Sequence, residues 1–99
     1  MSYMYVFSFI IFLSLYNTMN EPINISPIEQ YVIDYVIKLR KEKHLKQEDI
    51  ATILNVKRTF VTNVESAKNR AKYNLVHIAK LADHFGLSPK DFLPKEVSL

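Results

Sequence analysis

The chain has 99 residues, of which 48% are apolar and 23% charged, which is the size and composition of one globular domain. It contains no cysteine and one glycine, Gly86, which excludes disulfides, thiolate zinc sites, cysteine nucleophiles and glycine-rich phosphate loops. The net charge of +3 is concentrated between residues 40 and 72, where nine Lys and Arg occur with only four acidic residues, and this predicts either a polyanionic partner or a solvated basic face.

The first segment in chain order is an apolar, uncharged run over residues 3–16 (YMYVFSFIIFLSLY). It is shorter than the roughly 20 residues of a membrane-spanning helix, and no Lys or Arg precedes it as in a signal peptide. We expect natural translation to begin at Met19, with residues 1–24 forming an extension outside the domain. A membrane or targeting segment and a structural helix are the alternatives.

The next segment predicts a helix over residues 27–43. Ser26 can cap its start, Pro27 suits a first helical turn, and Glu29 completes a capping box. Apolar residues recur at helical spacing and form one continuous stripe that we expect to face the core. The stripe consists of Ile28, Tyr31, Val32, Tyr35, Val36 and Leu39.

Two short helices are predicted next, over residues 47–54 and 58–66. The apolar positions of the first are Ile50, Ala51, Ile53 and Leu54. Asn55 is expected to end it, because Asn tolerates the left-handed conformation that a tight helix exit requires. In the helix over residues 58–66, Val61 and Val64 are expected to face inward.

The rest of the chain predicts a loop and two more helices. Residues 67–73 (AKNRAKY) are expected to form an ordered loop. Asn74 can cap a fourth helix that Gly86 ends, and its expected inward stripe is Leu75, Ile78, Ala79, Ala82 and Phe85. The sequence from Ser88 to Asp91 repeats the helix-start signal for a short fifth helix, with Phe92 and Leu93 as its apolar residues and Pro94 at its end. No strand pattern occurs, so the chain is predicted to be all-α, with a domain over residues 25–94 and a tail over 95–99.

Residues 47–66 (QEDIATILNVKRTFVTNVES) have the spacing of a helix-turn-helix, with small Ala51 where the two helices cross and Asn55 in the turn. Residues 33–94 resemble the Cro/CI-type (XRE) helix-turn-helix family of bacterial and phage repressors. Besides the helix-turn-helix itself, the matching segments are IKLRKEKHLKQEDIA, which leads into it, and LVHIAKLADHFGLSPKDFLP after it. Asn55 stands where that family usually has Gly, and the loop over residues 67–73 is longer than usual. The resemblance implies a five-helix, lambda-repressor-like DNA-binding domain.

The resemblance also implies which residues would contact double-stranded DNA. The third helix would enter the major groove, and the residues expected to contact bases are Lys57, Arg58, Thr59, Thr62 and Asn63. No acidic residue occurs between residues 57 and 64, as it would on an ordinary solvated helix. Phe60 is expected to pack inside rather than to face DNA.

Further residues are expected at the DNA backbone. Gln47 resembles the family's phosphate-binding Gln, and the other phosphate-binding candidates are Lys46, Lys68, Asn69, Arg70 and Lys72, any of which could instead be only solvated. Arg40 and Glu65 resemble a family ion pair that ties the first helix to the recognition helix, the alternative being two independent surface charges.

No pattern in the chain predicts a catalytic or metal-binding site. His44, His77 and His84 lack metal-ligand spacing, and no catalytic arrangement of nucleophile, base and acid is evident. We therefore expect neither an enzyme nor a metal, cofactor or small-molecule substrate.

The expected function is that of a cytoplasmic, sequence-specific, DNA-binding transcriptional regulator, a repressor that covers its operator as a homodimer. The expected dimer surface lies on the fourth and fifth helices and includes Phe92, Leu93, Val97 and Leu99. One alternative is the antitoxin of a toxin–antitoxin pair, with a toxin as partner. Another is a protein-interaction or membrane-tethered module that does not bind DNA, which only the run over residues 3–16 supports.

Overall fold

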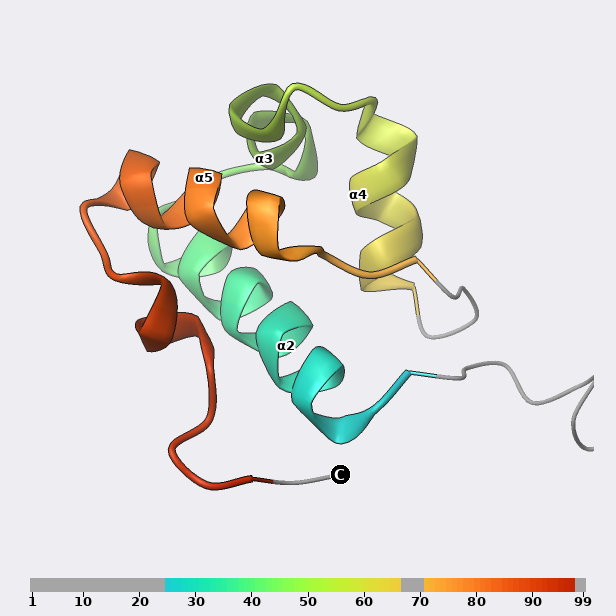
Figure 1. Ribbon diagram of the computed structural model, residues 1–99. Coiled ribbons are helices and arrows are strands. Elements are labelled where there is room, and N and C mark those ends of the chain that lie inside the picture. Colours follow the sequence, from blue (N-terminus) through green and yellow to red (C-terminus); the bar gives the residue numbers. More distant parts are fainter. Residues whose placement is uncertain (1–24, 67–70, 98–99) are drawn as a thin grey trace, which may run out of the picture.

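The computed structural model describes residues 25–66 and 71–97. Within these ranges the chain forms four α-helices and one 3₁₀-helix without strands: α2 (Pro27–Glu42), α3 (Gln47–Leu54), α4 (Arg58–Glu65), α5 (Leu75–Phe85) and η1 (Pro89–Phe92). Helix α3 packs against α4 and α5, while η1 packs against α2 and α5 (Figure 1). The all-α prediction is confirmed, except that the fifth helix is a 3₁₀-helix rather than an α-helix.

Helix α2 begins at the predicted capping box. The backbone N–H of Ser26 donates to Glu29 Oε1 over 3.0 Å, and the backbone N–H of Glu29 donates to Ser26 Oγ over 3.3 Å. The helix ends at Glu42, one residue before the predicted end. The reason is that His44 adopts a left-handed φ of 57°, which turns the chain toward α3.

The buried face of α2 differs from the predicted stripe. Its buried residues are Val32, Ile33, Val36 and Leu39, whereas Ile28 and Tyr31 are 36% and 43% exposed. Helix α2 is covered by α4 on one side and by η1 on another. This arrangement rotates the buried face toward Ile33, which periodicity alone had not placed in the core.

The α3–α4 unit forms as predicted, with Ile50, Ala51 and Leu54 buried on α3. Asn55 adopts φ 57° and ψ 47°, and the backbone N–H of Val56 donates to the carbonyl oxygen of Ala51 over 3.0 Å. This left-handed exit closes the end of α3 and sets the direction of the chain into α4. Helix α4 ends at Glu65, one residue before the predicted end, and its buried residues are Val61 and Val64.

Helix α5 has the predicted ends but a different buried face. The Asn74 side chain caps its start, and Gly86 ends it with a φ of 68°. Leu75 and Ala79 are exposed, while Leu81 is fully buried. Burial follows the packing of α5 against α3 and η1, and both neighbours lie on the side of Ile78, Leu81 and Ala82.

Aromatic residues complete the core. Phe92 of η1 is fully buried and packs edge-on against Tyr35, with ring centroids 4.8 Å apart. Tyr73, expected in an ordered loop, is only 7% exposed. Residues 67–70 of that loop and the extension over residues 1–24 lie outside the described residues. No helix within the described ranges is both long and apolar enough to cross a membrane.

Candidate nucleic-acid interface

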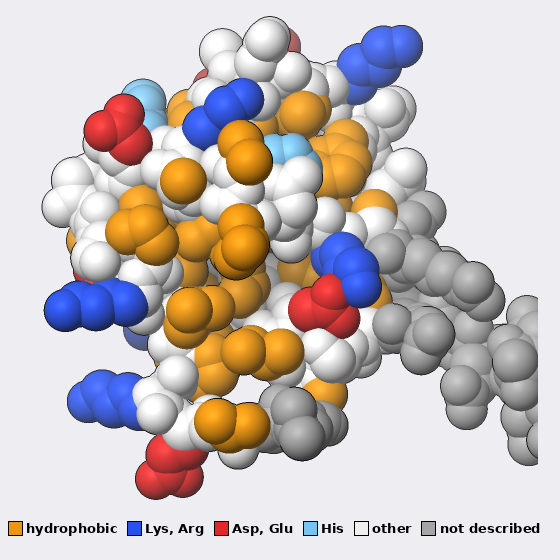
Figure 2. All heavy atoms as spheres, in the orientation of Figure 1, with side chains coloured by type: hydrophobic (Ala, Val, Ile, Leu, Met, Phe, Trp, Pro, Cys, Tyr) orange, Lys and Arg blue, Asp and Glu red, His pale blue; other side chains and the backbone are white. Residues whose placement is uncertain are grey.

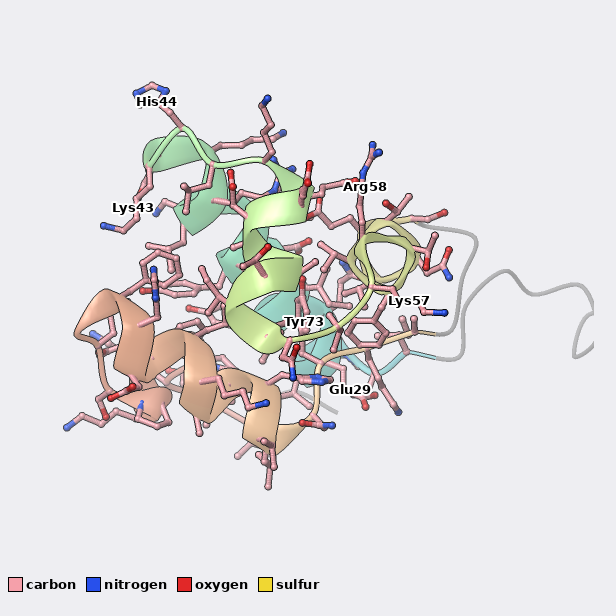
Figure 3. The ribbon with its side chains drawn as sticks, turned by 90° about the horizontal axis from the view of Figure 1, so that it is seen from above. Glu29, Lys43, His44, Lys57, Arg58 and Tyr73 are labelled. Carbon is pink, nitrogen blue, oxygen red and sulfur yellow. The ribbon has the colours of Figure 1, made fainter. Side chains whose placement is uncertain are left out.

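Helix α4 presents a polar face to solvent. Val61 and Val64 hold the helix against the core on its inner side. All five residues predicted to contact bases are exposed on this helix or at its cap: Lys57, Arg58, Thr59, Thr62 and Asn63. Arg58 points away from the body of the molecule (Figure 3). The structure therefore exposes all five residues, but Arg58 and Lys57 extend from different sides of α4 (Figure 3).

An ion pair joins α2 to α4 behind this surface. Arg40 donates from Nη2 to Glu65 Oε1 over 2.8 Å and from Nε to Glu65 Oε2 over 3.1 Å. Its third contact is a 3.0 Å hydrogen bond from Nη1 to the carbonyl oxygen of Leu45. The side chains of Arg40 and Glu65 are only 13% and 8% exposed. This bidentate geometry fixes the carboxyl end of α4 against α2 and the α2–α3 turn.

Gln47 extends the network to the outer face of α4. Its Nε2 donates to Glu65 Oε1 over 3.0 Å, and its Oε1 accepts from the Thr62 hydroxyl over 2.9 Å. The two contacts fix the orientation of the Gln47 amide. They also occupy the hydroxyl of Thr62, which is hydrogen-bonded to the carbonyl oxygen of Arg58 as well, at 3.2 Å.

A basic hollow of about 470 Å³ lies at the amino ends of α3 and α4. Its lining residues are Arg40, Leu45, Lys46, Gln47, Glu48 and Arg58. The hollow thus combines two of the predicted phosphate-binding residues, Lys46 and Gln47, with Arg58. Glu48 is the acidic side chain among these lining residues.

Of the remaining phosphate-binding candidates, Lys72 is described, and it is not among the residues that line this hollow. Lys68, Asn69 and Arg70 lie outside the described residues. The Lys72 ammonium forms an ion pair with Glu29 at 2.5 Å, and Glu29 lies on the side of the molecule away from Arg58 (Figure 3). The hydrogen bond from Lys72, with those from Ser26, lowers the pKa of the Glu29 carboxyl to about 2.

An aromatic cluster supports α4 from the side of α5. The Phe60 ring lies 6.1 Å from Tyr73 and 5.1 Å from His77, measured between centroids, as the predicted inward packing of Phe60 requires. Burial lowers the pKa of His77, and nearby Lys80 lowers it further. His77 Nδ1 accepts from the backbone N–H of Asn74 over 3.1 Å, which requires an unprotonated ring nitrogen.

Sequence reasoning did not single out Tyr73 and His77 as supports of α4. A signal for Tyr73 was present, because it directly precedes the Asn74 cap and pairs with Ile78 at the spacing of a hydrophobic staple. Both Tyr73 and Ile78 are buried in the same core cluster. His77 gave no comparable signal, since its role depends on the position of Phe60 in another helix.

Comparison with known proteins shows to which family the chain belongs. Residues 36–92, more than half of the chain, match the helix-turn-helix family HTH_3, so the chain belongs to the Cro/CI-type helix-turn-helix family. The matched range runs from the second half of α2 to the end of η1.

A solved structure of similar fold is described as a transcriptional regulator from Listeria innocua. The two chains share 28% sequence identity with a TM-score of 0.55. The similarity covers 67% of this chain and 62% of the Listeria chain, which is less than two thirds of that regulator. The search among curated proteins found no match.

Proposed function

We propose that this protein is a transcriptional regulator that binds double-stranded DNA by inserting the amino end of α4 into the major groove. The observation that carries the proposal is the exposed polar face of α4, which has no acidic residue between positions 57 and 64 and is held from behind by Val61 and Val64. Family membership and the similarity to a described transcriptional regulator support it.

Base contacts are proposed for the exposed residues of this face. Arg58 can bind guanine O6 and N7 with two hydrogen bonds, and Asn63 can bind adenine N6 and N7 in the same way. Lys57 and Thr59, which are also exposed, are proposed to contact neighbouring base edges. Thr62 would contact DNA through its methyl group or as an acceptor, because its hydroxyl proton is already shared between Gln47 and the Arg58 carbonyl.

Phosphate contacts are proposed for the hollow at the start of α3. Gln47 and Lys46 line it, and the helix start adds backbone N–H donors and a favourable dipole for an anion. Lys68, Asn69 and Arg70 remain predictions from the sequence. Lys72 would have to leave Glu29 before it could bind a phosphate, since the two form an ion pair.

Repression by occupation of the operator is the proposed mode of action. Two copies on half-sites one helical turn apart would cover a promoter. The family consists of DNA-binding regulators rather than enzymes. A role as antitoxin stays an alternative prediction, which a co-purifying toxin would support.

The test is selection of bound fragments from random duplex DNA, followed by affinity measurements on the enriched site. Replacing Arg58 by Ala is expected to lower affinity for that site by about 1–3 kcal/mol while changing affinity for unrelated DNA much less, because one bidentate base contact is lost. Lys90→Ala is the matched control, since it also removes one exposed positive charge but lies on η1.

Equal weakening on enriched and unrelated DNA would assign Arg58 to the phosphate backbone. Absence of enrichment of any sequence, together with absence of binding at low salt, would contradict the proposed function as a whole.

A further inference from the structure

His77 connects the start of α5 to both helices of the helix-turn-helix. Its ring lies against Phe60 of α4, with centroids 5.1 Å apart, and against Tyr73 at 6.0 Å. Further along α5, the Lys80 ammonium donates to the carbonyl oxygen of Leu54, the last residue of α3, over 3.4 Å. A charge at position 77 would therefore act on α4 through Phe60 and on the end of α3 through Lys80.

The same ring is part of the cap of α5. The backbone N–H of His77 donates to Asn74 Oδ1 over 2.8 Å, and the backbone N–H of Asn74 donates to His77 Nδ1 over 3.1 Å. In a capping box, Glu or Gln usually occupies the position that His77 holds here. Both keep an acceptor at neutral and mildly acidic pH, whereas histidine accepts only while Nδ1 is unprotonated.

Protonation of Nδ1 changes three interactions in the same direction. It converts the acceptor into a donor, so the backbone N–H of Asn74 loses its partner. It places a positive charge in the first turn of α5, at the positive end of the helix dipole. This charge also lies three residues before Lys80, a spacing at which like charges on a helix repel each other. Each change opposes the folded arrangement.

The immediate surroundings of the ring favour its neutral form. Burial lowers the pKa of His77, and the nearby Lys80 ammonium lowers it further. Tyr73 stays neutral, because burial raises the pKa of its hydroxyl. Hydrophobic side chains, which do not solvate a charge, form a band over the face of the molecule that carries α5 (Figure 2).

Carboxylates on α5, or on the elements α3, α4 and η1 beside it, could compensate a positive charge on the ring. Three of them already accept hydrogen bonds from other groups: Asp49, Glu65 and Asp91. The other two lie in the turns of α3 and α5 furthest from this site: Glu48 and Asp83. The remaining charged or titratable side chains of these elements and their flanking residues are basic: Lys46, Lys57, Arg58, Lys72, Lys80, His84 and Lys90. A charge on His77 would thus stay uncompensated within the described part of the chain.

We propose that His77 is a pH-sensitive positioning residue, which in its neutral form holds the start of α5 and supports the helix-turn-helix, and which releases both when its ring is protonated. The ring then leaves the cap and loosens the contact with Phe60, while Lys80 is repelled from its position at the end of α3. The stability of the fold consequently decreases in mildly acidic solution. A second consequence, weaker DNA binding by α4, rests on the proposed function.

The pH range of the effect follows from the direction of the pKa shift. The pKa of His77 in the folded chain lies below its ordinary value of 6.5, so the folded chain binds fewer protons than the unfolded chain. The contribution of neutral His77 is therefore fully present above pH 6.5 and is lost as the pH falls through the folded pKa. Glu29 loses its contribution at lower pH, between 4.5 and about 2, so the two effects can be measured separately.

The first test is urea unfolding of variants of the full chain, without DNA, between about pH 8 and pH 5. His77→Gln keeps an acceptor for the cap but cannot become charged. His84→Gln is the matched control, because it removes an exposed histidine from the last turn of the same helix. Over this range the unfolding equilibrium constant of the wild type, and of His84→Gln, is expected to rise by about threefold or more relative to that of His77→Gln.

NMR of the wild type tests the same inference without depending on a variant that folds. The ring nitrogens of His77 are expected to show Nδ1 unprotonated and Nε2 protonated at about pH 8, and to titrate below pH 6.5. The ring signals of Phe60 and the amide signals of α4 are expected to shift along the same titration curve. A purely structural side chain at position 77 would not produce this common curve.

The second consequence is measured on the duplex enriched by selection, at constant salt. Affinity of the wild type is expected to fall by about threefold or more from about pH 8 to pH 5.5, relative to that of His77→Gln. Protonation of exposed groups acts in the opposite direction, because added positive charge strengthens binding to phosphates. A fall in affinity is therefore specific to the proposed role of His77.

Identical pH profiles of stability for the wild type and His77→Gln would overturn the inference, and so would signals of Phe60 and α4 that do not follow the His77 titration. If only the DNA affinity failed to follow, the connection to DNA binding would be wrong and the proposed function would stand. Absence of binding to any duplex would contradict the proposed function, while unfolding and NMR would still decide the role of His77.

Discussion

Tyr73 carries a buried hydroxyl that has no hydrogen-bond partner among the described residues. Burial raises the pKa of this hydroxyl well above its usual range, and the nearby Glu65 carboxylate raises it further against the opposing effect of Arg40. A buried, unsatisfied polar group costs about 1–3 kcal/mol in folding free energy. The ring, by contrast, contributes packing against Phe60 and His77. At this position the aromatic ring stabilises the fold and the hydroxyl opposes it.

Replacing Tyr73 by Phe is therefore expected to raise the free energy of unfolding by about 1 kcal/mol, because the ring stays and the unsatisfied hydroxyl is removed. Urea unfolding at neutral pH measures the change. Tyr73→Ala is the control that removes the ring as well, and it is expected to cost about 3–5 kcal/mol. Destabilisation by Tyr73→Phe would show that the hydroxyl makes a favourable interaction.

The two turns that flank α3 depend on left-handed residues that are not glycine. His44 precedes the helix and Asn55 follows it, both with a φ of 57°. For most side chains this conformation costs roughly 1–2 kcal/mol, and Asn is one of the few that tolerate it. The turn at Asn55 sets how α4 leaves α3, so its conformation decides where the polar face of α4 points. The orientation of an exposed surface thus depends on one backbone conformation in a turn.

Asn55→Ala is expected to lower the free energy of unfolding by about 1 kcal/mol, while Asn55→Gly should stay within about 0.5 kcal/mol of the wild type. The difference arises because Ala adopts the left-handed conformation poorly and Gly adopts it freely. Chemical denaturation of both variants provides the measurement. Asn63→Ala is the matched control, because Asn63 is exposed within α4 and Ala has the higher helix propensity. Equal stability of the Ala and Gly variants at position 55 would contradict this account.

At the scale of the whole molecule, ion pairs and hydrogen bonds join segments that are distant in sequence. The Arg40–Glu65 pair and Gln47 join α2, α3 and α4, and the Glu29–Lys72 pair joins the start of α2 to the segment before α5. The Arg40–Glu65 pair is nearly buried, so removing one partner would leave a buried charge without a partner. The Glu29–Lys72 pair is partly exposed and therefore contributes less to stability. The carboxyl end of α4 is therefore positioned by polar contacts with α2 and the start of α3.

The ion pair between Glu29 and Lys72 predicts that the stability of the fold depends on pH. The pKa of Glu29 is lowered from 4.5 to about 2, so its contribution is present above pH 4.5 and is lost as the pH falls toward 2. Glu29→Gln is expected to lower the free energy of unfolding by roughly 1 kcal/mol at pH 6, and this difference from the wild type should shrink as the pH falls from 4.5 and vanish below pH 2. Urea unfolding at a series of pH values measures it.

Gln keeps hydrogen-bonding atoms for the cap at the start of α2 but removes the charge, so this variant reports the interactions of the ionised carboxylate with Lys72 and Ser26 together. Glu96→Gln, an exposed carboxylate in the chain end, is the control and should follow the wild-type pH profile. A difference between Glu29→Gln and the wild type that persists unchanged to pH 2 would exclude the ion pair as its cause.

Many features of the fold could be predicted from the local sequence, because helix ends are fixed by interactions between residues that are close in the chain. The Ser26–Glu29 capping box, the Asn74 cap and the left-handed Asn55 and Gly86 each depend on residues within one helical turn. The candidate base-contacting face was likewise predictable, because the polar residues of α4 and its two valines alternate with helical periodicity.

The sequence by itself determined that the described part of the chain is helical, where its helices begin and end to within about a residue, and which polar residues of α4 are exposed. Only the tertiary structure decided which side of α2 and α5 is buried, because an apolar stripe can be wider than the face that its neighbours cover. It also decided that Tyr73 lies in the core, that Lys72 binds Glu29, and that Leu75 stands beside an apolar hollow. These features join residues from different helices, and the relative placement of helices is set by packing rather than by local sequence.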